Sequence, residues 1–544
     1  MNCRPYSTPP RRTWGWLKAG LFGAALALFG TAQAQNVNVT ATAGTPAASY
    51  PTLNAAFNAI NLGTHQGSIV CTVVANTTEP APPTPLLSSG TGSSIYTDIM
   101  ITCSGNVTVN SAAAPTASRG VIEIQGADNV TIDGDDPLTS GTRNLTFASA
   151  AVATTGVAVV RFASTSTTNG ATFCTIRNCI VIGSRNSTTS TVTNYGIYSG
   201  TAIAGNTSTT GQSDNNDNMT IENNEVRRCF WGIYAAGTSA NKADNLIIRD
   251  NIIGSSTPAD AVVNRGIYIQ NTQTAASAAS AIVEGNDISI RADAGGTGND
   301  IANIEVANGN AGAFIRKNKI HDGIQASTGG QGCYGIFVTG STENSGVELS
   351  NNFIWDLNND NWSTSISATS ADIPIGIKVS VSATGLKILH NTISLDKANN
   401  DPASGGYSAC LQIHTTGAAG SDIRNNIFSN TQIATAASVH VCVLVPSGFP
   451  FGTINNNLYY APNAYHYTGW NGATRKTLGD WQAQTTQDGA SIAVQPPFVS
   501  NTDLHVSLAH PNASALNGTG ASGTGIAADI DDEARSTPPD IGAD

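Results

Sequence analysis

The chain has 544 residues, of which 11% are charged and 40% are hydrophobic, and it contains 55 glycines. This balance excludes long helices rich in Glu, Lys and Leu, and it excludes disorder driven by charge. The formal net charge of −12 argues against nucleic acid as the main partner.

Residues 1–34 are typical of a secretory signal, with a basic region at Arg11, Arg12 and Lys18 followed by a short apolar stretch. We expect cleavage near Ala34 and a mature protein that is secreted or held at the cell surface. The adjacent arginines leave open whether export is general secretory or twin-arginine. No later segment has the ~18 continuous apolar residues of a membrane span, so no transmembrane segment is expected.

Residues 35–100 are expected to hold an N-terminal cap and the first strands. Within them, residues 51–62 place Leu53, Ala56, Phe57 and Ile60 at helical spacing. The spacing predicts an amphipathic helix with one apolar face.

Residues 101–460 are dominated by a repeat: an apolar residue, any residue, a small or polar residue, Asn, any residue, an apolar residue. Its Asn positions lie 27 to 39 residues apart: Asn224, Asn251, Asn286, Asn318, Asn352, Asn391, Asn426 and Asn457. The units are rich in β-branched residues, Asn, Gly, Ser and Thr, and their apolar residues alternate with period two. Units of short strands that stack on copies of themselves predict a right-handed parallel β-helix, an all-β solenoid.

The Asn column is interpreted as structural. A sharp bend between two strands of one coil needs a residue that tolerates positive φ, and Asn tolerates it better than most residues. Stacked Asn side chains ~4.8 Å apart can also hydrogen-bond along the axis as a ladder.

A column of charged residues is expected to point outward from the strand before each bend. It runs Arg177, Glu222, Arg249, Glu284 and Arg316, so its sign alternates from coil to coil. Neighbouring strands would set these groups side by side as ion pairs. We therefore interpret these arginines as scaffold and not as catalytic residues.

A second repeated pattern, Gly-Ile-Tyr or a variant of it, predicts another strand with its own outward column. Six residues of this column form the candidate ligand-binding surface: Tyr198, Tyr234, Tyr268, Glu305, Phe337 and Lys378. One interpretation is that the aromatic rings stack and shield a sheet face. The other is a platform on which sugar rings stack, with Glu305 and Lys378 as polar contacts.

Eight cysteines follow the signal, and two pairs of them are separated by 32 residues, about one coil: Cys71 with Cys103, and Cys410 with Cys442. Export permits disulfides, and stacked strands bring Cα atoms within bridging range. These four are disulfide candidates. The alternative is that they stack unbridged in the interior.

Candidate acid–base and metal residues are few. Asp356 and Asp360, with nearby Asn residues, could coordinate Ca²⁺ in a loop, and no other cofactor is indicated. Lys319, His321 and Asp322 follow one Asn bend and could join as a base and its partners. The plainer interpretations are a loop and a solvated bend. The acidic run at Asp133, Asp135 and Asp136 is most simply a turn.

Residues 461–544 lack the repeat and are expected to form an irregular C-terminal cap. Residues 50–67 and 127–134, and the tail at 529–535 and 539–544, resemble secreted bacterial β-strand-repeat proteins of the right-handed, pectin-lyase-like β-helix family. The resemblance covers nearly all of the mature chain. That fold carries polysaccharide lyases and glycoside hydrolases. Since related chains often continue further, we expect either a freely secreted protein or a product truncated at Asp544.

The predicted function is an extracellular β-helix that presents an elongated surface for adhesion or carbohydrate binding, without catalysis. Its partner would be a polysaccharide or a cell-surface glycan. The alternative is a polysaccharide lyase or glycoside hydrolase acting in a groove along the helix. Aromatic and acid–base residues converging in one groove would favour the enzyme. The oligomeric state stays open.

Overall fold

The computed structural model describes residues 34–544 except 112–117, 140, 150–155, 185–193, 202–214, 274–280, 293–298, 327–329, 341–343, 360–364, 381–382, 398–405, 415–419, 434–437 and 450. The chain divides into two compact units, residues 1–35 and residues 36–544. Because the described residues begin at 34, the expected secretory signal at residues 1–34 lies almost wholly outside them.

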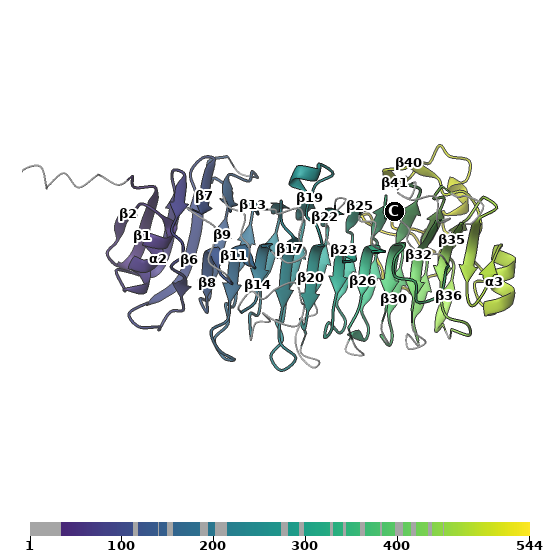
Figure 1. The fold of residues 1–544 in the computed structure, drawn as a ribbon, viewed down its shortest axis with the longest axis horizontal. Helices are drawn as coiled ribbons and strands as arrows, with labels where there is room; N and C mark the ends of the chain where they lie inside the picture. The colour runs from purple at the N-terminus through teal and green to yellow at the C-terminus, as the bar shows by residue number, and fades with distance from the viewer. Residues whose placement is uncertain are drawn as a thin grey trace, which may run out of the picture. The chain divides into compact units, whose positions relative to one another are not determined.

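Residues 36–544 form a parallel β-helix, as the repeat predicted, in which each full coil contributes one strand to each of three sheets (Figure 1). We call these sheets A, B and C, in the order in which a coil visits them. Equivalent strands of successive coils pair in parallel. Antiparallel pairing among the described strands occurs only near the two ends of the helix and in one small hairpin.

Sheet A has 14 strands: β2 (Ala47–Tyr50), β1 (Val37–Gly44), β3 (His65–Val73), β6 (Tyr96–Cys103), β9 (Val130–Asp133), β12 (Thr175–Arg177), β15 (Thr220–Glu222), β18 (Ile247–Arg249), β21 (Ile282–Glu284), β24 (Phe314–Arg316), β27 (Glu348–Ser350), β30 (Lys387–Leu389), β33 (Asp422–Arg424) and β36 (Thr453–Asn455).

Sheet B has 12 strands: β4 (Thr77–Glu79), β7 (Val107–Ser111), β10 (Leu145–Ala148), β13 (Cys179–Ile182), β16 (Glu225–Arg227), β19 (Ile252–Gly254), β22 (Asp287–Ala292), β25 (Lys319–Gln325), β28 (Phe353–Trp355), β31 (Thr392–Leu395), β34 (Ile427–Asn430) and β37 (Leu458–Tyr460).

Sheet C has 13 strands: β5 (Leu86–Leu87), β8 (Gly120–Gln125), β11 (Val157–Ala163), β14 (Asn194–Ser199), β17 (Trp231–Ala236), β20 (Arg265–Gln270), β23 (Ile301–Val306), β26 (Cys333–Val338), β29 (Pro374–Val379), β32 (Tyr407–Ile413), β35 (Val439–Leu444), β38 (His466–Trp470) and β39 (Thr474–Arg475). The remaining elements are helices α2 (Leu53–Asn61) and α3 (Leu478–Thr485), 3-10 turns η1 (Pro258–Asp260) and η4 (Ala513–Ala515), and the hairpin β40 (Phe498–Ser500) and β41 (Asp503–Val506).

The predicted Asn ladder is confirmed at the bend from sheet A to sheet B. Asn286 shows the pattern: its Oδ1 accepts from the backbone N–H and from Nδ2 of Asn251 in the preceding coil, at 3.1 and 3.0 Å. Its own Nδ2 donates to Oδ1 of Asn318 in the next coil at 2.9 Å. All eight ladder residues are buried. The ladder therefore satisfies the backbone polar groups that a two-residue bend leaves inside the solenoid.

The prediction that the ladder Asn itself has positive φ is wrong by one residue. The left-handed conformation belongs to the residue before each ladder Asn, as at Asn223 with φ 51° and Lys317 with φ 57°. The ladder Asn itself is not among the positive-φ residues of the described chain. The first bend residue makes the turn, and the second points inward to hydrogen-bond.

The charge ladder on the outer face of sheet A is also confirmed. Arg177 lies 2.8 Å from Asp133 and 3.6 Å from Glu222, and Arg249 lies 2.6 Å from Glu222. Arg316 pairs with Glu284 at 2.8 Å. These arginines belong to the scaffold, where each partly exposed pair contributes only ~0–1 kcal/mol.

A side chain at the glycine of each Gly-Ile-Tyr pattern would point into the solenoid. A Cβ on Gly266 would lie 2.4 Å from the carbonyl oxygen of Asn303 and 2.6 Å from Cγ2 of Ile288 on sheet B. Gly232, Gly335 and Gly376 make the same kind of contact with sheet B isoleucines. The pattern thus allows sheets B and C to approach closely.

The predicted disulfides are absent: all eight described cysteines are buried and free. The strand register explains the first pair, because Cys71 lies opposite Ile101 while Cys103 lies opposite Val73. Cys410 and Cys442 do share one inward column, but their thiols donate to the carbonyls of Ser429 and Phe428 on sheet B.

Both ends of the solenoid are covered, as expected. Helix α2 begins after the cap Thr52 and buries Leu53, Ala56, Phe57 and Ile60 against the first coils. At the other end, α3 buries Trp481 beside Gly469.

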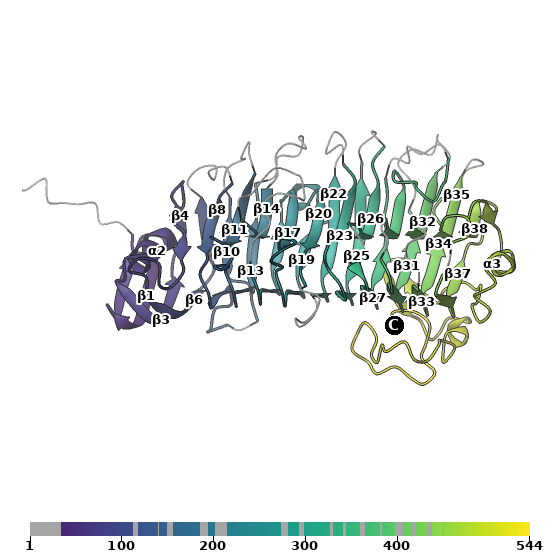
Figure 2. The same cartoon turned by 90° about the horizontal axis from the view of Figure 1, so that it is seen from below.

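Residues 495–544 do not simply form a cap at the end of the solenoid. This C-terminal segment runs back alongside sheets A and B as far as β24 (Figure 2). Bend residues of successive coils hold its backbone: Asn456 donates to Thr519, Asn425 to Ala521 and Asn351 to Ala528, at 2.8 to 3.0 Å.

Asn286→Ala is expected to lower the free energy of unfolding by roughly 2–4 kcal/mol, because two buried donors of Asn251 lose their acceptor. The measurement is the thermal and urea midpoint of the purified protein. Asn501→Ala, at an exposed loop position, is the control and should leave both midpoints unchanged. Equal midpoints for both variants would contradict a stabilising ladder.

Gly266→Ala is expected to destabilise the protein by about 1–3 kcal/mol, since its Cβ has no space between Asn303 and Ile288. Gly489→Ala is the matched control, because nothing lies within 4 Å of the Cβ it adds. A Gly266→Ala protein with the wild-type melting temperature would show that sheets B and C do not need this close approach.

Candidate functional site

The outer face of sheet B gathers acid, base and aromatic side chains on three consecutive coils. Strand register places Asp287 beside Lys319 and Lys319 beside Phe353. The neighbouring column places His321 on the coil before Trp355. We call the group formed by Asp287, Lys319, His321, Asp322 and Trp355 the His321 cluster.

His321 is the centre of this cluster. Its Nε2 lies 2.8 Å from Asp287 and its Nδ1 lies 2.9 Å from Asp322. The ring stacks on Trp355 with centroids 4.6 Å apart and planes 15° apart. Asp322 reaches the ring because it adopts φ 49° at an irregularity in the pairing of β22 with β25.

The electrostatics keep His321 protonated at neutral pH. Burial alone would lower its pKa, but the hydrogen bonds with Asp287 and Asp322 outweigh burial and raise the pKa to about 9. The same contact lowers the pKa of Asp322. The imidazole ring is therefore a fixed cation that can donate a proton, and it is a poor base at neutral pH.

A second acidic group lies one coil further along the same sheet. Asp356 is buried and pairs with Lys397 at 2.9 Å. Burial and the neighbouring Asp356 raise the pKa of Asp396 to about 6. Asp356 thus has a cationic partner within the chain. Asp360, the other predicted Ca²⁺ ligand, lies outside the described residues, so the Ca²⁺ site stays a prediction.

A groove of about 860 Å³ runs beside the His321 cluster. Its floor is the outer edge of β18, β21, β24 and β27, with Asp287 and Lys319 from sheet B, and its far wall is the C-terminal segment at 525–532. A smaller depression of about 280 Å³ continues from it, lined by His321, Ser289 and the loop that carries η1. Asp287 lines both the groove and the smaller depression.

Lys319 is the cation of the groove with the fewest partners. The other cationic side chains of its floor and wall are paired, Arg249 with Glu222, Arg316 with Glu284 and Lys317 with Asp532. Within the described part of the chain, no hydrogen bond or ion pair holds the Lys319 ammonium. Its charge acts on Asp503 of the C-terminal segment without a direct ion pair, so the ammonium can still contact a ligand in the groove.

The predicted aromatic platform on sheet C is stacked but not open, and the prediction of an exposed platform is wrong. Tyr198 and Tyr234 stack at 4.7 Å, and Tyr234 and Tyr268 stack at 5.0 Å. All three are at most 1% exposed. The rings lie against Tyr195 and Trp231 of the adjacent outward column, so they form the shield that was the other interpretation.

The polar members of that column are buried too. Glu305 pairs with Arg265, and Lys378 donates to the Tyr334 hydroxyl at 2.7 Å. Burial lowers the pKa of Lys378 to about 8. Phe337 is half-buried beside Tyr334. These side chains contact one another, and no contact among the described residues indicates a ligand site between them.

The acidic turn at residues 133–136 matches its plainer interpretation. Asp133 pairs with Arg177, Asp135 accepts the N–H groups of Gly141 and Thr142, and Asp136 accepts those of Gly105 and Leu138. These are contacts of a folded turn.

The sequence argument missed Asp287, Trp355 and Lys397. It aligned the outward columns of sheets A and C but not that of sheet B. The signal was present: the residue after each ladder Asn and the residue two positions further form the two outward columns of sheet B. Read in register, they show Asp287, Lys319, His321 and Trp355 together.

Comparison with known proteins yields structural likeness only. No protein-family model and no curated protein sequence matches the chain. The A-module of mannuronan C-5 epimerase AlgE4 from Azotobacter vinelandii is similar at 12% identity and TM-score 0.37, over 74% of this chain and 91% of that one. The AlgE6 A-module of the same organism is similar at 10% identity and TM-score 0.25, over 69% and 90%. At these identities the likeness concerns the β-helix fold and gives no residue of this chain a role.

Among the described residues, neither helix has the length and apolar character needed to cross a bilayer.

His321→Asn is expected to destabilise the protein most at low pH. A histidine whose folded pKa is raised contributes stability that is complete below its unfolded pKa of ~6.5 and is lost as pH rises through the folded value of about 9. The difference in melting temperature between wild type and variant should therefore narrow from pH 6 to pH 10. A difference that stays constant over this range would contradict the clamp formed by Asp287 and Asp322.

Proposed function

We propose that this protein binds an extended polysaccharide outside the cell, in the groove beside the His321 cluster. One observation carries the proposal: two adjoining polar depressions, which share Asp287 in their lining, bring Lys319, Asp287 and His321 together from two neighbouring coils, and the C-terminal segment walls the larger one. Export is proposed from the signal-like residues 1–34.

The shape of the groove suits a linear chain of sugar rings. Its floor crosses four adjacent strands of sheet A, which corresponds to roughly 14 Å at ~4.8 Å per strand. The lining alternates carboxylates with ammonium and guanidinium groups, so sugar hydroxyls would meet both acceptors and donors. Lys319 would meet a hydroxyl or a uronic carboxylate without first breaking an ion pair within the described chain.

A second candidate function is favoured by the His321 cluster itself. A protonated His321 hydrogen-bonded to Asp287, with the Lys319 ammonium nearby, provides an acid, a carboxylate base and a cation that can neutralise a uronic carboxylate. Those are the groups that a polysaccharide lyase needs. The convergence of acid–base and aromatic side chains is the feature that would distinguish an enzyme from a binding protein.

One experiment separates the two functions. The purified protein is incubated with acidic and neutral polysaccharides, and the soluble sugars are analysed by mass spectrometry while binding is followed by affinity electrophoresis. Binding with intact polymers supports the proposed binding function. Shorter chains with unsaturated ends show a lyase, and shorter chains with added water show a hydrolase. Absence of both binding and cleavage across the panel would reject the groove as a polysaccharide site.

Lys319→Ala is expected to weaken binding of the best polysaccharide about tenfold or more, because a charge-assisted hydrogen bond contributes about 1.5–3 kcal/mol. Asp287→Asn should weaken it as well. Lys242→Ala, on the turn from sheet C to sheet A, is the matched control and should bind like wild type. Equal affinities for Lys319→Ala and Lys242→Ala would show that the ligand binds elsewhere.

A further inference from the structure

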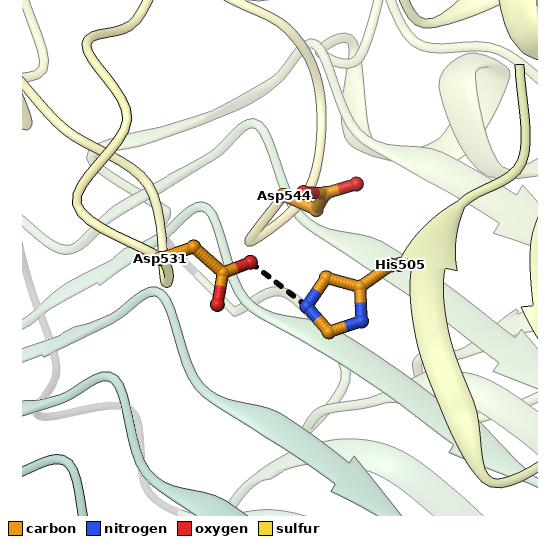
Figure 3. A group of neighbouring side chains, drawn as sticks. All are labelled: His505, Asp531 and Asp544. Carbon is orange, nitrogen blue, oxygen red and sulfur yellow. Dashed lines mark hydrogen bonds and ion pairs between the residues drawn. The ribbon is translucent and has the colours of Figure 1, made fainter.

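Three ligand-type side chains converge on the C-terminal segment, at one wall of the groove. His505 on β41, Asp531 in the turn at 529–533 and Asp544 at the last position each offer one atom, and these atoms lie within 4.8 Å of one another. Figure 3 shows the Asp531 carboxylate beside Nε2 of the His505 ring and the Asp544 side chain next to the same ring. Separate stretches of the segment thus meet at one point.

The imidazole ring of His505 is held so that one nitrogen points into this group. Its Nδ1 is hydrogen-bonded to Asp503, and its Nε2 lies 2.8 Å from Asp531. The Phe353 ring on β28 packs edge-to-face against it at 5.0 Å. A carboxylate on one nitrogen, with the other nitrogen directed at the ligand group, is the arrangement that orients histidine ligands of metal ions.

Three carboxylates lie around His505, and Lys319 acts electrostatically on one of them, Asp503. Asp503, Asp531 and Asp544 surround one imidazole ring, and they raise the pKa of His505 even though burial alone would lower it. The bonds that hold Asp544 in place use only one of its oxygens, which accepts the Val506 N–H. Asp531 is 46% exposed and faces the groove.

We propose that His505, Asp531 and Asp544 bind a zinc ion, with Asp503 as the carboxylate that orients His505. One imidazole nitrogen and two carboxylate oxygens are zinc ligands, at ~2.0–2.2 Å. In a tetrahedron of that size the ligand atoms lie roughly 3.4 Å apart, so the observed group needs only small side-chain movements to reach it. The fourth position would hold water and would open toward the groove that Asp531 lines.

The zinc ion would fasten the C-terminal segment. It would join β41, the turn at 529–533 and the last residue over Phe353, and so would fix the wall of the groove. The inference depends on the geometry of this segment alone and not on the proposed polysaccharide function, so each can fail without the other.

The test uses the purified full chain after treatment with EDTA. Titration calorimetry with ZnCl2 is expected to show one site, and saturating zinc should raise the melting temperature. CoCl2 should give visible absorption bands typical of a low-symmetry N/O site. Asp531→Asn and His505→Gln should each lower zinc affinity at least tenfold. Because Asp531 is half exposed, its variant should fold with the wild-type circular dichroism spectrum.

Glu533→Gln is the matched control, since Glu533 is an exposed carboxylate in the same turn outside the group. It should bind zinc like wild type. Absence of zinc binding by the wild-type chain would overturn the proposal. So would binding that His505→Gln and Asp531→Asn leave unchanged, because the ion would then sit elsewhere.

Discussion

The structure depends on hydrogen bonds that run along the axis between equivalent residues of successive coils. The Asn ladder is the clearest case, because an Asn such as Asn286 accepts two hydrogen bonds from the preceding coil and donates one to the next. The bend from sheet A to sheet B is therefore the same in every coil from β15 to β37, whatever the length of the loop that follows sheet C. Side chains far apart in sequence but equal in register are brought side by side, and this fixes what each outer face can do.

The outer faces of sheets A, B and C differ in the contacts that their side chains make. Sheet A pairs opposite charges from coil to coil, and sheet C stacks tyrosines that shield one another. On both faces, side chains of successive coils contact neighbours of the same kind. Sheet B breaks this pattern, because Asp287, Lys319, His321 and Trp355 follow one another without a repeat. Among the described residues, the Lys319 ammonium of this face has no hydrogen bond or ion pair, and this supports the proposed site beside sheet B.

Most of the fold could be predicted from the sequence because of the repeat. The candidate site could not, because it depends on contacts between residues that are far apart in the sequence. Ladder residues, inward isoleucines and the sign-alternating arginines recur at fixed places in the unit, so a single chain shows them. The left-handed residue was misplaced because bends such as Asn351-Asn352 hold two residues that tolerate it. The burial of Tyr234 could not be predicted either, because it depends on side chains of neighbouring strands on the outer face of sheet C. The path of the C-terminal segment could not be predicted, because it has no period and its contacts with Asn351 and Asn425 span 96 to 177 residues.

The same two-residue bend links the scaffold to the site. Its second residue, the ladder Asn, points inward and serves the core, so its identity is constrained at every coil. Its first residue needs only to tolerate positive φ and points outward, where its side chain is free for other contacts. In the later coils Asn351, Asn425 and Asn456 use that freedom to hold the backbone of the C-terminal segment, and Lys317 pairs with Asp532. The segment in turn forms the wall that makes a groove of an otherwise open sheet edge. Substitution at the first bend position should therefore alter the groove while leaving the solenoid intact, whereas substitution at the second should weaken the solenoid itself.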